Sequence, residues 1–338
     1  MDTPDGKPLR NSTRHLVAPD LLPWLEAMPD ETWGPDMLPS RRALIIELAG
    51  SGKPPLRPDV TLEERVIPGP RAAPDVRVVI VRPRERASLE PAILHFHGGG
   101  YVAGLPEMAR ATVASFAGEV GAVVISVDYR LAPETRFPGA LEDCYAALAW
   151  LHANAGDLGV DPARIAVSGD SAGGGLAAGL ALLARDRHEY GIAFQHLVFP
   201  ALDDRTAVRT DLSPLVGEFI WTQASNVYAW TSLLGEPPGG PHVSPYAAPA
   251  RAEDLARLPP ACIQVGGLDL FVDESVDYAR RLAVAGVPCE LHVYPGAPHG
   301  FTMAWRAGVT TALDRDSHLA LRHALRPHPA DARTVTAR

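Results

Sequence analysis

The stretch RIAVSGDSAGGGLAAGLALLARD, residues 164–186, decides the fold, because a buried strand, a sharp turn and a buried helix follow one another in it. The apolar run at 164–170 predicts the strand. The uncharged run from Ala172 to Ala184 predicts a core helix, since it is too short to span a bilayer. Between them lies G-x-S-x-G at 169–173, a pattern typical of a serine on a strand-to-helix turn.

Ser171 has two interpretations. On a sharp turn its hydroxyl would be exposed as a nucleophile, and the glycines two positions either side would let strand and helix pack closely. The N–H of Ala172 and the helix N-terminus would then face a developing negative charge. Alternatively, Ser171 only caps the helix. The strand before it and the buried helix after it favour the nucleophile.

The rest of the chain alternates strands with helices from about residue 60, which predicts an α/β fold with a mostly parallel central sheet and helices on both faces. Near-continuous Val and Ile runs indicate strands that are buried on both sides. The predicted strands cover 76–83, 91–97, 122–130, 164–170, 194–200, 261–267 and 289–295. Helical patterns lie between them, notably at 141–156 and 274–286.

Two segments do not fit the alternation. Residues 1–50 contain short helical patterns rich in Leu and Trp, and about 204–248 contains no clean strand but several aromatic residues. We therefore expect a helical cap made from an N-terminal segment, 1–50, and a second segment inserted at about 204–248. The catalytic domain would then cover 51–338.

A glycine loop, HFHGGGYVAG at 95–104, follows the predicted strand 91–97. Residues 98–103 fit G-x-G-x-x-A, a dinucleotide-binding pattern, but that site needs a helix to begin at the third glycine. Gly104 and Pro106 interrupt such a helix. The alternative is an oxyanion hole, in which the bare N–H groups of Gly98 and Gly99 approach a developing charge.

A serine nucleophile needs a general base and an acid that orients the base. In a sheet of this kind the order is Ser, then Asp or Glu, then His, each after a strand. His299 lies in the turn after the strand 289–295, and Asp269 follows the strand 261–267. Asp273 and Glu274 compete with Asp269, although both fit the first turn of the next helix.

Other histidines and the cysteines fit structural roles better. His95 and His196 fall inside predicted strands, and His292 is expected to be a packed or surface residue. His95 and His97 could form a metal pair, but no third ligand is near them in sequence. The three cysteines show no C-x-x-C spacing, which argues against a zinc site or a disulfide framework. No metal and no cofactor is expected.

The composition limits the classes of molecule that the protein is expected to bind. The net charge of −9 disfavours nucleic acid and anionic membranes. The N-terminus is polar, and no run of about 18 apolar residues occurs, so we expect a cytoplasmic protein without stable membrane association. A small neutral substrate fits best.

These motifs together resemble the hormone-sensitive-lipase family of α/β-hydrolases, the bacterial family IV esterases. The resemblance rests on HGGGY (97–101), DYRLAPE (128–134), GDSAGGGLA (169–177), DLFVDE (269–274) and PHGF (298–301). It is strongest to the branch of acyl esterases similar to heroin esterase. It implies the α/β-hydrolase fold, a helical cap, and Ser171, Asp269 and His299 as nucleophile, acid and base. Gly98, Gly99 and Ala172 would form the oxyanion hole. The motif usually has proline after the acid, where this chain has Leu270.

The resemblance implies a cofactor-free serine carboxylesterase that acts on small ester substrates. Tryptophans in the expected cap lead us to predict short acyl chains on bulky or aromatic alcohols. Dimers that pair at the last strand are frequent in the family, so a homodimer there is open. Two rivals stay open: a ligand receptor on the same fold, and a lactonase, amidase or peptidase.

Overall fold

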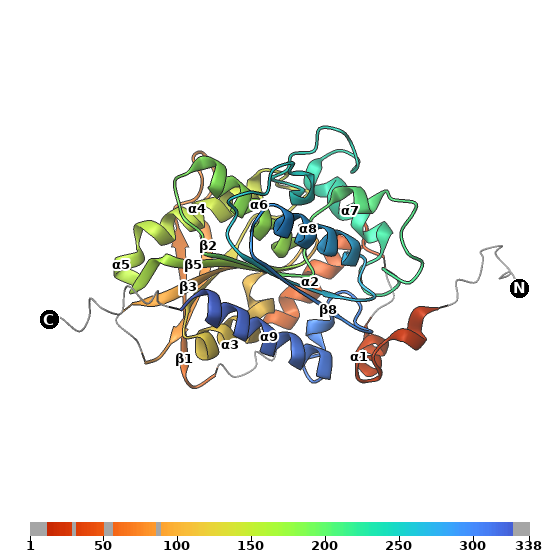
Figure 1. The fold of residues 1–338 in the computed structure, drawn as a ribbon, viewed down its shortest axis with the longest axis horizontal. Helices are drawn as coiled ribbons and strands as arrows, with labels where there is room; N and C mark the ends of the chain where they lie inside the picture. The colour runs from red at the N-terminus through yellow and green to blue at the C-terminus, as the bar shows by residue number, and fades with distance from the viewer. Residues whose placement is uncertain (1–11, 29–31, 51–56, 86–88, 327–338) are drawn as a thin grey trace, which may run out of the picture.

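The computed structural model describes residues 12–28, 32–50, 57–85 and 89–326 (Figure 1). An eight-stranded sheet lies at its centre, with the strand order β1-β2-β4-β3-β5-β6-β7-β8. The two pairs that involve β2 are antiparallel, and every other pair is parallel. The α/β-hydrolase fold expected from the sequence is therefore present.

All seven predicted strands are confirmed, with small shifts at their ends. The strands are β2 (Val76–Pro83), β3 (Glu90–Phe96), β4 (Val123–Asp128), β5 (Val160–Asp170), β6 (Phe194–Val198), β7 (Ala261–Gly266) and β8 (Cys289–Tyr294). Because β3 to β8 all run parallel, their carboxyl ends meet along one edge of the sheet. Ligand and catalytic groups collect at this edge in open α/β sheets.

One strand was missed by the sequence prediction. β1 (Val60–Ile67) pairs with β2 at one side of the sheet. Its middle is the charged run Glu63 to Arg65, which gives no apolar alternation, and only its end residues Val60 and Ile67 are fully buried. Charged residues are typical of an edge strand, because they discourage pairing with another chain.

Helices cover both faces of the sheet (Figure 1). α4 (Gly139–Ala153), α6 (Ala172–Arg187) and α8 (Val272–Val284) lie on one face, and α3 (Arg110–Ser115) and α9 (Gly308–Ala324) lie on the other. α6 is buried at every position from Ala172 to Ala184, as its lack of charge predicted. It packs against β5 and β6, so its N-terminus is fixed at the carboxyl edge.

The two segments outside the alternation contact one another. The N-terminal part contains α1 (Leu22–Ala27) and α2 (Leu38–Gly50), and the later segment contains α7 (Gln223–Leu234). Glu218 accepts hydrogen bonds from the backbone N–H and the hydroxyl of Thr13, both at 2.6 Å. The N–H of Trp33 donates to Ser225 Oγ. Residues 1–11 and 29–31 of the expected N-terminal cap segment lie outside the described residues, as do 51–56, 86–88 and 327–338 of the expected catalytic domain.

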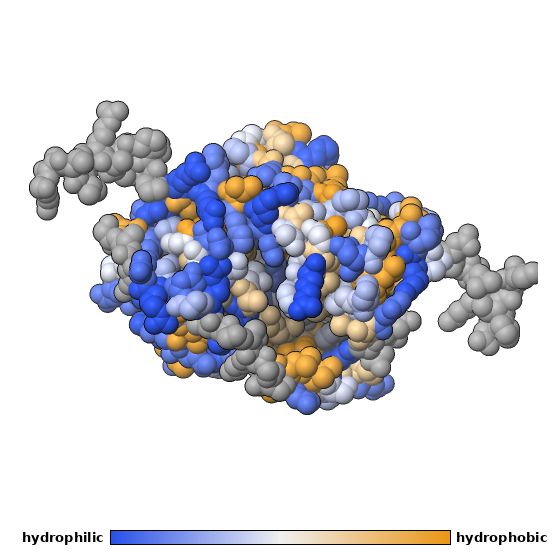
Figure 2. All heavy atoms as spheres, turned by 90° about the horizontal axis from the view of Figure 1, so that it is seen from below, coloured by the Kyte–Doolittle hydropathy of each residue, from blue (hydrophilic) through white to orange (hydrophobic). Residues whose placement is uncertain are grey.

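The surface over α3 and α9 shows hydrophilic residues over most of its area, with hydrophobic residues in small separate groups (Figure 2). Among the described residues, no helix combines the length and the apolar character needed to cross a membrane.

An ion pair between the DYRLAPE segment and α4 gives a stability prediction. Asp143 is fully buried and accepts hydrogen bonds from Arg130, at 2.9 Å from its backbone N–H and at 2.7–3.1 Å from its guanidinium. Replacing Arg130 by methionine leaves that carboxylate buried without its cation, which costs about 3–5 kcal/mol of unfolding free energy. Urea denaturation measures the loss.

The matched control is Arg280→Met, whose partner Asp277 is more than half exposed, as Arg280 is itself. Exposed pairs contribute about 1 kcal/mol or less. Equal losses in the two variants would contradict a structural role for the Arg130 pair.

Candidate active site

Ser171 lies at the sharp turn between β5 and α6. Its backbone has φ 55° and ψ −117°, a strained conformation for a residue with a side chain. Hydrogen bonds fix the turn on both sides: the Ser171 N–H donates to the Val198 carbonyl at 2.9 Å, and the N–H groups of Gly175 and Ala201 donate to the Ser171 carbonyl at 3.0 Å. The structure thus holds the predicted serine at the carboxyl edge of the sheet.

The glycines of G-x-S-x-G are required by close packing. A Cβ at Gly169 would overlap the backbone of Gly173, and a Cβ at Gly173 would overlap the Phe96 carbonyl of β3. Any larger residue would push α6 away from the sheet and tilt Ser171. The sequence argument for small residues at these positions is therefore confirmed by the packing.

The structure brings Ser171, His299 and Asp269 into one hydrogen-bonded row. His299 Nε2 lies 2.9 Å from Ser171 Oγ, and His299 Nδ1 lies 2.8 Å from Asp269 Oδ2. All three are buried, and Asp269 is fully so. The other carboxylate oxygen, Oδ1, accepts from the Phe271 N–H at 2.9 Å, which fixes the orientation of the acid.

The two competing acids lie elsewhere. Asp273 is about half exposed and faces Arg209, with 3.5 Å between Oδ2 and Nη1. Glu274 is buried, but it accepts hydrogen bonds from the N–H of Leu202 and the hydroxyl of Thr206. Burial raises the pKa of the Glu274 carboxyl. Of the three candidate acids, only Asp269 contacts His299.

The glycine loop packs directly against Ser171. A Cβ at Gly98 would lie 3.2 Å from the Asp170 carbonyl oxygen and 3.6 Å from the Ser171 Cβ, so the loop backbone lies close to the turn that holds Ser171. Gly99 has φ 125°, a conformation that glycine alone adopts readily. In the described part of the chain, the N–H groups of Gly98 and Gly99 donate to no other backbone group. The N–H of Ala172 begins α6, where helical N–H groups have no partner within the helix.

His97 holds the backbone of the glycine loop in place through its ring and its carbonyl. Burial lowers the pKa of the His97 imidazole to about 4, so the ring is neutral at pH 7. Its Nδ1–H donates to the Gly98 carbonyl at 2.8 Å, and the ring stacks on Tyr129 with 4.3 Å between centroids. The Tyr129 hydroxyl donates to the His97 carbonyl at 2.6 Å. These contacts hold the backbone at His97 and Gly98 in place.

No helix begins at the third glycine, so the dinucleotide interpretation fails on geometry. The next helical turn, η3 (Pro106–Ala109), starts only at Pro106. His95 is buried with Nδ1 beside Ser126 Oγ, and His196 is buried between Ser168 and Gln264, as expected for packed histidines.

Aromatic side chains surround His299, and most of them were not identified from the sequence. Phe199 and Phe271 contact the His299 ring edge to face, with centroids 4.8 Å and 5.1 Å away. The ring centroid of Trp221, from the segment around α7, lies 6.0 Å from that of His299 and 6.0 Å from that of Trp33 in the N-terminal segment. No local motif marks these positions, because their contacts join parts of the chain that are far apart in sequence.

Asp170 is a second titratable group at the site that the sequence did not single out. Burial raises the pKa of its carboxyl to about 7, and the nearby His299 opposes that rise. Its backbone carbonyl faces Gly98. The residue before the serine therefore carries a carboxyl that changes charge near neutral pH.

Known proteins are similar to this chain over most of its length. Residues 93–303 match the model of a family described as having the alpha/beta hydrolase fold. Esterase LipI of Mycobacterium tuberculosis is 36% identical over 305 residues, covering 89% of this chain and 90% of that protein. Carboxylesterase NlhH of the same species is 36% identical over 255 residues, covering 73% and 77%.

Among solved structures, one described as bacterial heroin esterase is 40% identical with a TM-score of 0.87, covering 94% of this chain and all of that one. The sequence motifs, the order of strands in the sheet and the similarity to these relatives all indicate the same family. The protein therefore belongs to the hormone-sensitive-lipase family of α/β-hydrolases and is a carboxylic ester hydrolase.

Proposed function

We propose that the protein is a serine carboxylesterase that acts through Ser171, His299 and Asp269. The observation that carries the proposal is the unbroken row of contacts from Ser171 Oγ through both nitrogens of His299 to Asp269 Oδ2. A carboxylate at Nδ1 holds the imidazole in the tautomer whose Nε2 can accept a proton. That nitrogen faces the serine hydroxyl.

In the first half of the reaction, Ser171 Oγ attacks the ester carbonyl while His299 Nε2 takes its proton. The tetrahedral intermediate collapses as His299 returns that proton to the leaving alcohol, and the acyl group stays on Ser171. In the second half, His299 takes a proton from water, which attacks the acyl-enzyme. The acid is released, and the Ser171 hydroxyl regains its proton.

The oxyanion in both halves would be bound by the N–H groups of Gly98, Gly99 and Ala172. The close approach of Gly98 to Ser171 and the start of α6 beside Ser171 support this assignment. One such donor contributes about 10²–10³ to turnover in measured cases. Preorganised amides suit this role because they need no reorientation during the reaction.

For the substrate, we propose short-chain acyl esters of bulky or aromatic alcohols. The aromatic side chains around His299 support an apolar pocket, and the similarity to a heroin esterase supports esters of a large alcohol. We expect kcat/KM on 4-nitrophenyl esters to be highest for acetyl to butyryl chains and to fall at least about tenfold at octanoyl, by loss of fit. Matched anilide and lactone substrates should react more slowly than the ester.

Trp221 gives a more specific prediction. The Trp221 ring packs against Gly100 so closely that a Cβ there would overlap it, and the ring centroid lies 6.0 Å from that of His299. The Trp221 Nε1–H donates to Asn226 Oδ1 at 3.2 Å. Trp221→Ala should enlarge the pocket and raise the octanoyl-to-acetyl ratio of kcat/KM by about tenfold, since one or two methylenes are worth that much. Trp305→Ala is the control, because Trp305 is two-thirds exposed. An unchanged ratio in Trp221→Ala would exclude Trp221 from the pocket.

The same proposal includes the cap, the assembly and the compartment. The contacts of Glu218 with Thr13 and of Arg42 with the Val102 carbonyl support a cap built from 1–50 and 204–248 that rests on the glycine loop.

β8 is the last strand in the sheet order, which supports a homodimer that pairs through this strand. Analytical ultracentrifugation tests the dimer. The three free cysteines suit a reducing compartment, the cytoplasm.

A further inference from the structure

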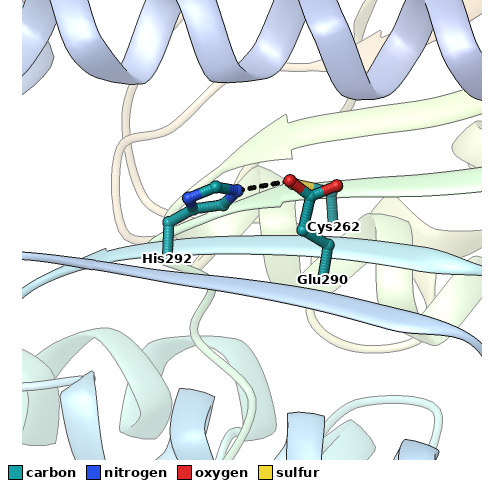
Figure 3. A group of neighbouring side chains, drawn as sticks. All are labelled: Cys262, Glu290 and His292. Atoms are coloured by element: carbon teal, nitrogen blue, oxygen red, sulfur yellow. Dashed lines mark hydrogen bonds and ion pairs between the residues drawn. The ribbon is translucent and has the colours of Figure 1, made fainter.

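Three side chains outside the candidate active site form a set of metal-type donors on the sheet (Figure 3). Cys262 comes from β7, and Glu290 and His292 come from β8. One donor atom of each, the sulfur, a carboxylate oxygen and a ring nitrogen, lies within 4.8 Å of the other two.

The register of the two strands creates this group. Cys262 lies opposite Glu290, and Gln264 lies opposite His292 in the parallel pair. Alternate residues of a strand share a face, so Glu290 and His292 point to the side that carries α9, where Cys262 packs. The sequence could not reveal the group, because its sulfur comes from a different strand than its imidazole and carboxylate.

The donor types fit zinc. Zn²⁺ binds Cys sulfur, His nitrogen and carboxylate oxygen, often with three protein ligands and a water. His292 Nε2 faces Glu290 Oε1 at 2.7 Å, and a bound ion would replace this hydrogen bond. Glu290 is about half exposed, so its side chain can adjust to a metal–ligand distance.

The surroundings of His292 add a second observation. Its other nitrogen, Nδ1, lies 3.7 Å from Asp316 Oδ2 on α9. A carboxylate behind a ligating histidine is the usual arrangement at zinc sites, where it orients the ring. The Tyr294 hydroxyl donates to the same Asp316 oxygen at 3.0 Å and holds it in place.

We propose that Cys262, Glu290 and His292 bind one Zn²⁺ per chain, with water as the fourth ligand. This departs from the sequence-based expectation of no metal.

Such an ion would join β7 to β8, the strands that end just before Asp269 and His299. We therefore expect zinc to raise the melting temperature by several degrees, since it binds only the folded chain. Because the hydrogen bonds of His299 go to Ser171 and Asp269 and not to these three ligands, kcat at 25 °C should stay within about twofold.

The test uses the full chain, freed of metal with a chelator and titrated with Co²⁺ as a spectroscopic probe. We expect a thiolate-to-cobalt charge-transfer band that saturates at one ion per chain and is abolished by Zn²⁺. Calorimetry with Zn²⁺ should give the same stoichiometry. No thiolate band, or saturation at half an ion per chain, would overturn the proposal.

Variants locate the site. Cys262→Ser should remove the thiolate band, and His292→Ala, on a half-buried edge position, should weaken zinc binding at least about tenfold. Cys289→Ser is the matched control, since Cys289 lies on β8 next to Glu290 and packs on the opposite face of the sheet. A band that survives in Cys262→Ser, or disappears in Cys289→Ser, would refute the assignment. Circular dichroism checks that each variant is folded.

Discussion

Ser171→Ala should lower kcat on 4-nitrophenyl acetate by about 10⁶-fold, as removal of a triad serine does in a measured protease. Without Oγ no acyl-enzyme can form, and His299 has no hydroxyl to deprotonate. What activity remains would come from substrate binding and the oxyanion donors. Steady-state rates and labelling by a serine-directed organophosphate measure the effect.

The control for this variant is its fold. Alanine at φ 55° keeps the strain that serine already bears, so the melting temperature should change little. A folded variant with the wild-type rate would refute Ser171 as the nucleophile. A wild-type protein that binds esters but is never labelled would instead support the ligand-receptor alternative.

Asp269→Asn should lower kcat by about 10⁴-fold, because an amide at this position favours the tautomer of His299 that cannot accept the serine proton. The Phe271 N–H can still donate to the amide oxygen, so the turn should keep its geometry. The loss should lie in kcat, whereas KM should stay within a few fold. Initial rates over a range of substrate concentrations separate the two parameters.

Asp273→Asn is the matched control, since it changes the same functional group four residues along the chain. Asp273 is about half exposed and only faces Arg209, so kcat should stay within about twofold. This pair of variants also answers the question raised by Leu270. If Asp273→Asn were the inactive variant, the acid assignment would be wrong.

Much of the fold was predictable because it depends on consecutive residues. The apolar run at 261–267 and the uncharged run after Ser171 each record burial on all sides. β1 was not predicted because it has no such run: charged residues separate its two buried ends. β1 is specified by its partner β2 rather than by its own periodicity.

The order of Ser171, Asp269 and His299 along the chain, each at the end of a strand, was determined by the sequence itself. Only the tertiary structure decided which acid contacts His299. Asp269 and Asp273 are four residues apart, and local sequence patterns do not show which of the two side chains points toward the histidine. It also placed Trp33 beside Trp221, and Cys262 beside His292. These contacts depend on strand register and on packing between distant segments, which no short stretch of sequence specifies.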